Sequence, residues 1–188
     1  KRILVEFVSS NPTGPLHVGH GRGAAYGDAL VRVLRASGYD AASEYYINDA
    51  GRQMDILAVS VFLRYLELCG EEFEFPANAY QGDYVFDIAA SLHRDLGEDL
   101  RQPLDAIIGS LPKDGDQLLD TLISRAKTLL GKECFTRIHD LARDTLVDDI
   151  REDLSQFGVT FDHWFSENTL VTGNAVERVV EKLTENGL

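Results

Sequence analysis

Two histidines three residues apart, His17 and His20, lie in the segment of the chain best suited to chemistry. They follow a run rich in glycine, proline and asparagine, residues 9–16, and a mostly apolar segment, residues 3–8. A helical pattern continues after them to about Ser37. A strand, a glycine-containing turn and a helix in that order are typical of a phosphate-binding corner in a parallel α/β sheet. The two imidazoles would add donors toward charge that develops on a phosphorus centre.

The glycines of this segment support the same interpretation. Gly14, Gly19 and Gly21 would let the backbone approach a phosphate closely, because they lack a Cβ. The start of the helix would present unpaired N–H groups and a partial positive charge. An ordinary turn is the alternative for such a composition. A dinucleotide-binding loop is excluded, because residues 19–24 do not give G-x-G-x-x-G directly after the strand.

The elements that would hold this corner alternate between strand and helix. The nearly continuous apolar run of residues 2–8 predicts a buried parallel strand. A helix should follow His20 and be capped by Gly38, a second strand should span residues 41–47, and a second helix residues 51–68. This order implies a parallel sheet with right-handed crossovers. The apolar positions at helical spacing in the first helix are Ala24, Ala25, Ala29, Leu30, Val33 and Leu34.

The second part of the chain is mainly helical. Residues 71–83 form a connector, and residues 84–157 carry leucines at helical spacing that predict two or three helices ending at Gly158. A short strand at 159–165 and a final helix at 174–185 complete the pattern. The expected fold class is therefore α/β, with a parallel sheet followed by a mainly helical region.

At these motifs the chain resembles the bacterial form of arginyl-tRNA synthetases, which are class I enzymes whose first signature is His-Ile-Gly-His. The similarity is specific at residues 5–23, where Val18 replaces the usual isoleucine, and at residues 44–54. It is weaker at residues 80–85 and 161–167.

The resemblance also implies a domain organisation. It places the first half of the Rossmann-like catalytic domain in residues 1–75, a mainly helical insertion in 76–158 and a segment returning to the core in 159–188. The family's second, lysine-rich signature has no counterpart, since the lysines stand only at positions 1, 113, 127, 132 and 182. We therefore expect a fragment of the catalytic domain that is inactive or nearly so by itself.

The resemblance implies a ligase that attaches L-arginine to its cognate tRNA through an arginyl-adenylate made from ATP. Mg²⁺ would accompany ATP, and no protein-bound metal is expected. His17 and His20 would be the catalytic residues. The implied contacts to ATP are Asn11, Pro12, Thr13, Gly14, His17, Gly19 and His20. The implied contacts to arginine are Glu6, Ser9, Asn11 and His17.

Glu6 also has a physical argument in its favour. It is the only charged residue inside an apolar strand, where an unpaired buried carboxylate is costly. At the carboxyl end of a strand it would face the ligand crevice, and a guanidinium offers it planar, bidentate donors. A solvent-facing edge residue or an internal salt bridge is the alternative. For Ser9 and Asn11 the alternative is ordinary capping of the turn.

Four further residues follow the second predicted strand at its carboxyl end, where ligand contact is favoured. They are Asn48, Asp49, Gly51 and Gln53. Asp49 is equally suited to cap the N-terminus of the following helix, and both possibilities stay open.

Charge and composition limit the other possibilities. The net charge is −13, but it divides into +1 for residues 1–64 and −14 for residues 65–188. The acidic part would point away from tRNA, and its helical face at 148–153 needs no explanation beyond solvation. We expect a cytoplasmic protein without membrane contact, because no signal peptide or membrane-length apolar run is visible, and a monomer in the complete enzyme.

Two other functions are compatible with the sequence. One is a different H-x-G-H nucleotidyltransferase that acts on a small metabolite. The other is a non-catalytic interaction module whose acidic helices bind a basic partner. ATP binding that depends on His17 and His20 would argue against the second.

Overall fold

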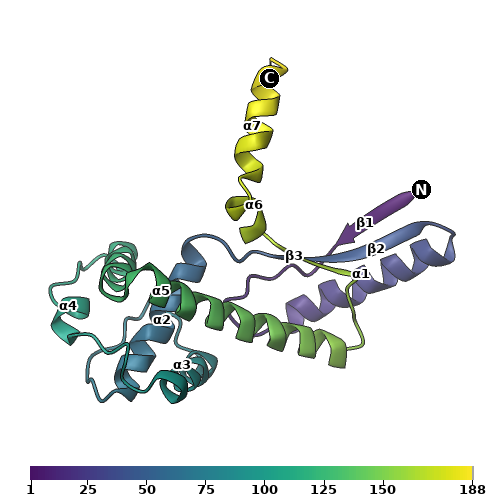
Figure 1. The fold of residues 1–188 in the computed structure, drawn as a ribbon. Coiled ribbons are helices and arrows are strands. Elements are labelled where there is room, and N and C mark those ends of the chain that lie inside the picture. Colours follow the sequence, from purple (N-terminus) through teal and green to yellow (C-terminus); the bar gives the residue numbers. More distant parts are fainter. Residues whose placement is uncertain (188) are drawn as a thin grey trace. The chain divides into compact units, whose positions relative to one another are not determined.

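The structure, a computed structural model, describes residues 1–187, which form two compact units (Figure 1). The sheet unit comprises residues 1–50 and the described residues from 147 onward. The helical unit comprises residues 51–146. The second predicted helix packs with the later helices, whereas the end of the long helix packs under the sheet. The expected division at 75 and 158 into catalytic domain, insertion and returning segment stays a prediction.

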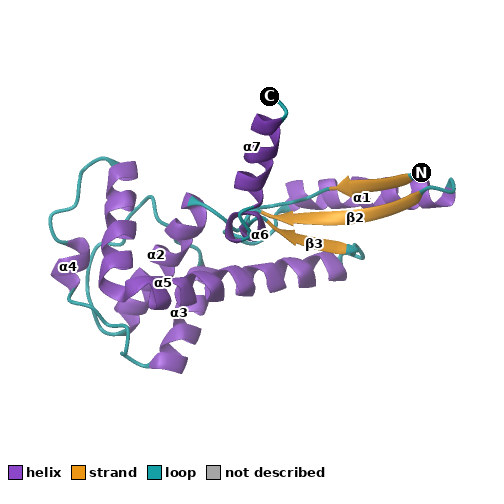
Figure 2. Ribbon diagram, turned by 45° about the horizontal axis from the view of Figure 1, so that its top comes forward, coloured by secondary structure: helices purple, strands orange, loops and turns teal. Residues whose placement is uncertain are grey.

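The sheet unit is built on three parallel strands in the order β1-β2-β3 (Figure 2). The strands are β1 (Arg2–Glu6), β2 (Asp40–Ile47) and β3 (His163–Ser166). Leu4 lies opposite Ala42, and Tyr45 lies opposite Trp164. The predicted α/β class and its parallel sheet are confirmed.

One face of the sheet is covered by helix α1 (Val18–Ala36) and by the last part of helix α5 (Gly115–Gln156). Side chains alternate along β2, so Tyr45 and Ile47 are buried in this layer. The buried core of the unit is completed by Ala24, Val147, Ile150, Leu154 and Val159.

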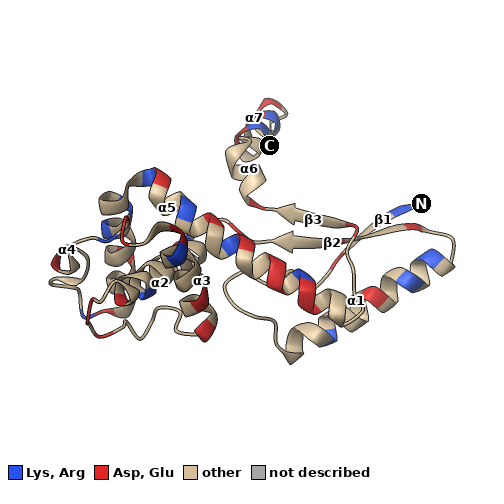
Figure 3. Ribbon diagram, turned by 60° about the horizontal axis from the view of Figure 1, so that its bottom comes forward, with Lys and Arg blue, Asp and Glu red and all other residues tan. Residues whose placement is uncertain are grey.

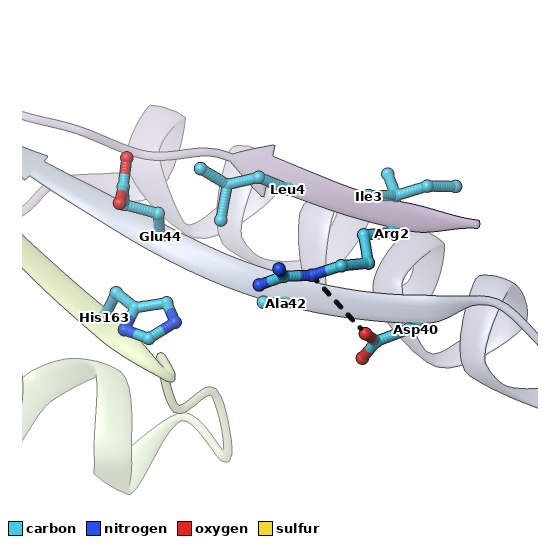
Figure 4. Close-up of a pocket in the computed structure, with 7 residues that line it drawn as sticks. All are labelled: Arg2, Ile3, Leu4, Asp40, Ala42, Glu44 and His163. Carbon is cyan, nitrogen blue, oxygen red and sulfur yellow. Dashed lines mark ion pairs between the residues drawn. The ribbon is translucent and has the colours of Figure 1, made fainter.

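The opposite face of the sheet is open. Leu4 is 56% exposed, and a hollow of about 540 Å³ lies over this face (Figure 4). Its lining includes Glu44 and His163, together with Arg2, which pairs with Asp40. The prediction that the first strand is buried was therefore wrong, because β1 is an edge strand covered on one face only.

Helix α1 starts at Val18, three residues earlier than expected, and ends as predicted, before Gly38. Its buried face agrees with the predicted one at Ala24 and differs beyond it: Gly27 and Val31 are buried, whereas Leu30 and Val33 are 38% and 62% exposed. The reason is that the side chain of Phe7 lies close to the backbone of Gly27. A Cβ built on Gly27 would lie 2.1 Å from Cγ of Phe7, so only glycine leaves room for that ring.

The helical unit has its own core. It contains α2 (Arg52–Leu68), α3 (Asp83–Leu96), α4 (Leu104–Ile108) and the first part of α5, which is kinked at Gly131. Leu57, Phe62 and Leu63 of α2 are fully buried in it. The predicted helical character of this region is confirmed.

After β3, the chain forms a short helix α6 (Asn168–Thr172), which the sequence analysis did not predict, and α7 (Ala175–Glu185), which it did. The acidic residues 148–149 and 152–153 are exposed on α5, where the ribbon of Figure 3 is coloured red for Asp and Glu over several neighbouring stretches. Within residues 1–187, no helix combines the length and apolar character needed to cross a membrane.

Candidate active site

His17 and His20 form a reciprocal cap at the N-terminus of α1. The Nδ1 atom of His17 accepts a hydrogen bond of 3.1 Å from the backbone N–H of Gly19. The Nδ1 atom of His20 accepts one of 3.1 Å from the backbone N–H of His17. The two rings stack with their centroids 3.8 Å apart. The N-terminus of α1 therefore fixes both imidazoles. The imidazoles in turn accept hydrogen bonds from two backbone N–H groups that would otherwise be unpaired.

This cap determines what the histidines offer to a ligand. Each Nδ1 atom is an acceptor, so in the neutral form the proton of each ring sits on Nε2. Burial, and then the neighbouring charge of His17, lower the pKa of His20 below 6.5, which favours the neutral ring at pH 7. Two Nε2–H donors are thus available beside the positive end of the helix, an arrangement suited to an anion such as phosphate.

Gly19 is required by the cap itself. A Cβ at this position would lie 2.9 Å from Cε1 and 3.0 Å from Nδ1 of His17. A larger residue would push the imidazole away from the N–H group that it accepts. This reason is local and independent of any bound ligand.

The turn before the helix has an unusual backbone. Val8 and Ser9 have φ values of 65° and 41°, and the N–H of Ser9 donates to the carbonyl of Phe7 over 3.0 Å. L-residues rarely adopt such angles, and each costs about 1–3 kcal/mol. The N–H of Thr13 then donates to the carbonyl of Asn11 over 2.8 Å, and Pro12 is buried. Tight turns thus follow one another between β1 and the histidines, and Gly14 lies partly buried after them.

The hydroxyl of Ser9 has a backbone partner. Its Oγ atom accepts a hydrogen bond of 3.1 Å from the N–H of Tyr46 in β2. This bond ties the turn to β2 and is not the local turn capping that the sequence offered as an alternative, which stays open. The proposed contacts of Ser9 and Asn11 with arginine stay predictions.

Glu6 is the last residue of β1, at the carboxyl end of the sheet. It is exposed on the open face and lies opposite Glu44 in the register. The expectation of a buried carboxylate was wrong and the solvent-facing alternative holds, because within residues 1–187 no element covers this face of β1. Two carboxylates on neighbouring strands repel each other, and a bound cation would relieve that repulsion. The role of Glu6 toward arginine stays a prediction.

Asp49 neither faces solvent nor caps the following helix. It is 2% exposed, its Oδ2 accepts from the hydroxyl of Ser166 over 2.7 Å, and its Oδ1 accepts from the N–H of Asn168 over 2.9 Å. The cap, one of the two possibilities left open, is not formed, because Gly51 is the N-cap residue of α2 and no side chain bonds to that helix start. Asp49 instead joins the ends of β2 and β3.

The other residues of this block are divided between the units. Asn48 is partly buried in the sheet unit, whereas Gly51 and Gln53 are exposed in the helical unit. Their ligand contacts stay predictions. Among residues 1–187, no three His, Cys, Asp or Glu side chains gather as a metal site.

Two residues that hold the surroundings of the site, Asp162 and Tyr45, were not predicted from the sequence. Asp162 Oδ2 accepts hydrogen bonds from the N–H and hydroxyl of Ser43, at 2.7 and 2.8 Å, and from Arg35 at 2.6 Å. The hydroxyl of Tyr45 donates to the carbonyl of Ser10 over 3.0 Å. These partners lie far apart in the sequence, so no local pattern could have revealed them.

Comparison with known proteins relates this fold to one family. Residues 1–75 match the model of the class I (R) tRNA synthetase catalytic domain. The whole chain is 54% identical to an arginine--tRNA ligase of Thioalkalivibrio sulfidiphilus and 51% identical to one of Legionella pneumophila strain Corby. It covers 33% of each of these relatives.

Solved structures agree with the sequence relatives. A crystal structure from Campylobacter jejuni, assigned as an arginyl-tRNA synthetase, is 31% identical with a TM-score of 0.74. The match covers 98% of this chain and 34% of that one. Arginyl-tRNA synthetase of Thermus thermophilus, 24% identical with a TM-score of 0.50, supports the fold alone. The predicted resemblance is thus confirmed: the chain is similar over its whole length to about one third of the arginine--tRNA ligases, with a class I (R) catalytic-domain sequence in residues 1–75.

Proposed function

We propose that this chain binds ATP and L-arginine as part of an enzyme that joins arginine to its tRNA. The observation that carries the proposal is the reciprocal cap of His17 and His20, which presents two Nε2–H donors at a helix N-terminus. The similarity to arginine--tRNA ligases gives the substrate class.

The first step would be a displacement at phosphorus. A carboxylate oxygen of arginine forms a bond to the α-phosphorus of ATP, and the bond from that phosphorus to the bridging oxygen of pyrophosphate breaks. No proton has to move, because the carboxylate is already a nucleophile, so positioning and charge stabilisation carry the step. In the second step the arginyl group passes to a hydroxyl of the terminal adenosine of tRNA, and AMP leaves.

His17 and His20 would stabilise the charge that develops on the phosphoryl oxygens. Their donors are held by the fold before the ligand arrives, so little reorganisation accompanies the reaction. Loss of one such donor costs about 10²–10³ in rate in other enzymes with anionic transition states. Mg²⁺ bound to ATP would supply further positive charge at the phosphates.

Glu6 would bind the guanidinium of the substrate arginine. It lies at the carboxyl end of β1, where open α/β sheets bind their ligands. Its position opposite Glu44 raises the local negative charge, which favours a cationic side chain. Ser9 and Asn11 lie in the adjoining turn, within the same stretch of chain as the histidines.

Calorimetric titration of the chain with ATP and with L-arginine tests the proposal. Glu6→Gln should weaken arginine binding at least tenfold, whereas Glu44→Gln, the matched control on the neighbouring strand, should change it less. His20→Ala should weaken ATP binding, and His163→Ala should leave it unchanged. Binding of neither ligand by the unaltered chain would contradict the proposal. ATP binding without arginine binding would favour another nucleotidyltransferase.

Turnover is a separate question, because the chain spans only about a third of its relatives' length. We expect the chain alone to show no aminoacylation of the arginine tRNA. Formation of arginyl-tRNA above the level of a His17→Ala, His20→Ala double variant would show that expectation to be wrong.

A further inference from the structure

The strained turn between β1 and α1 is held by bonds from β2. Val8 and Ser9, at φ values of 65° and 41°, would relax toward ordinary angles if nothing opposed them. Two consecutive residues of β2 oppose this. The N–H of Tyr46 donates to Ser9 Oγ over 3.1 Å, and the hydroxyl of Tyr45 donates to the carbonyl of Ser10 over 3.0 Å.

Tyr45 is itself rigidly placed. It is 1% exposed, it stacks on Trp164 with centroids 4.5 Å apart, and it meets Phe161 edge-on at 5.4 Å. Phe161 also packs against Phe7, the residue that precedes the turn, at 4.4 Å. The aromatic cluster therefore fixes both the start of the turn and the hydroxyl that bonds to it. Burial raises the pKa of Tyr45 to about 12, so the phenol stays a donor throughout the physiological range.

We infer that Tyr45 is a positioning residue of the substrate site: its hydroxyl holds Ser10 and thereby keeps Ser9 and Asn11 where they meet the amino acid. The inference rests on the proposed function for the identity of the ligand, L-arginine. The bonds that hold the turn do not depend on that function. The ring of Tyr45 serves packing, as in any buried tyrosine, whereas its hydroxyl donates one specific hydrogen bond, to the carbonyl of Ser10. Without it, the bond from the N–H of Tyr46 to Ser9 Oγ would still tie the turn to β2.

Tyr45→Phe removes the hydroxyl and keeps the ring. Hydrogen exchange at the amides of Ser9 and Thr13 should speed up on the order of tenfold, as expected for the loss of one hydrogen bond. The dissociation constant for L-arginine should rise by a similar factor. Tyr65→Phe is the matched control, because Tyr65 is equally buried and its hydroxyl also bonds to backbone, at Gly97 and Leu100. It should leave both measurements unchanged.

A rescue variant separates positioning from simple packing. Val8→Gly removes the conformational cost of a positive φ, together with the packing of the Val8 side chain against the core, so the backbone of the turn needs less restraint. In the Tyr45→Phe background, Val8→Gly should therefore restore slow exchange at Ser9 and recover much of the arginine affinity. A packing role for Tyr45 would instead make the two substitutions additive.

Each outcome decides the inference. Unchanged exchange at Ser9 and Thr13 in Tyr45→Phe, or the same change in Tyr65→Phe, would overturn it. If the unaltered chain binds no arginine, the proposed function fails for this chain. The exchange measurement and the rescue by Val8→Gly would still determine whether Tyr45 holds the turn.

Discussion

The two units differ in how completely they bury their own apolar side chains. In the helical unit, α2 is buried on nearly every side. In the sheet unit, one face of the sheet is open and the apolar face of α7 is about half exposed. Among residues 1–187, Phe86 is the single exposed large hydrophobic residue that lies in the helical unit, and all the others lie in the sheet unit.

This contrast shows which unit buries its own apolar side chains within the chain. The helical unit encloses a core of its own, whereas the sheet unit carries the candidate chemistry on a thinner core with a strained turn. Open apolar surface of this kind is typical of a face that packs against further structure. The stability of the sheet unit, which contains the candidate active site, therefore depends more on a few specific contacts than on the total apolar area that it buries.

Matched leucine substitutions should give the largest difference between the units. Leu57 in α2 is fully buried, so Leu57→Ala should lower the free energy of unfolding by about 3–5 kcal/mol. Leu30 in α1 is 38% exposed, so Leu30→Ala should cost less than about 1 kcal/mol. Urea denaturation measures both. Equal losses of unfolding free energy in the two variants would show that the difference in burial does not affect stability.

Two glycines of α1 provide the next test. Gly27→Ala should destabilise the sheet unit by about 1–3 kcal/mol, because its Cβ would collide with Phe7. Gly23 has open space around it, so Gly23→Ala should be neutral or stabilise the helix by up to about 1 kcal/mol. Thermal unfolding of the two variants gives the comparison, and a stable Gly27→Ala protein would rule out the close approach.

These glycines also show which parts of the fold the sequence could predict. The ends of α1 and α2 follow from local signals, because Gly38 and Gly70 adopt the positive φ that ends a helix. The buried face of α1 does not follow from the same signals. Leucine and valine at helical spacing indicated one face, but the room that Phe7 needs selects the face with Gly27. A contact between distant residues decided the packing.

The acid sensitivity of the sheet unit should be the next effect in size. Hydrogen bonds from Ser43, and the charge of Arg35, hold the pKa of Asp162 below its usual value. The ionised form is favoured in the fold, so this contribution is complete above the ordinary aspartate pKa of about 3.9. It is lost as the pH falls through the lowered value.

Asp162→Asn should therefore reduce stability at pH 7 and flatten the dependence of stability on pH below about 4. The matched control is Asp40→Asn, because the ion pair of Asp40 with Arg2 is 3.7 Å long and largely exposed. Urea denaturation between pH 3 and 7 measures both variants. An unaltered acid slope in Asp162→Asn would show that other carboxylates carry the effect.

The candidate site was predictable where its residues are consecutive. His17, Gly19 and His20 lie within one turn of helix, so their spacing alone placed them together. Glu6 was located correctly at the end of a strand but incorrectly as buried, because the sequence does not say which strand forms the edge. Asp49 and Asp162 have partners about 119 residues away, and such bonds leave no local pattern.

The smallest predicted effect concerns the histidine cap itself. The pKa of His20 is lowered, so its NMR titration should have a midpoint below 6.5. The cap should weaken as the pH falls through that midpoint, because a protonated Nδ1 no longer accepts a hydrogen bond.

Gly19→Ala should displace the imidazole of His17 and cost about 1 kcal/mol of helix capping. The His20 midpoint should then rise toward the ordinary value, because the ring of His20 loses part of its burial and the neighbouring charge of His17. Gly21→Ala, which meets no atom within 4 Å, should leave the midpoint unchanged. A shift of equal size in both variants would mean that helix propensity, rather than the contact between Gly19 and His17, sets the state of the two imidazoles.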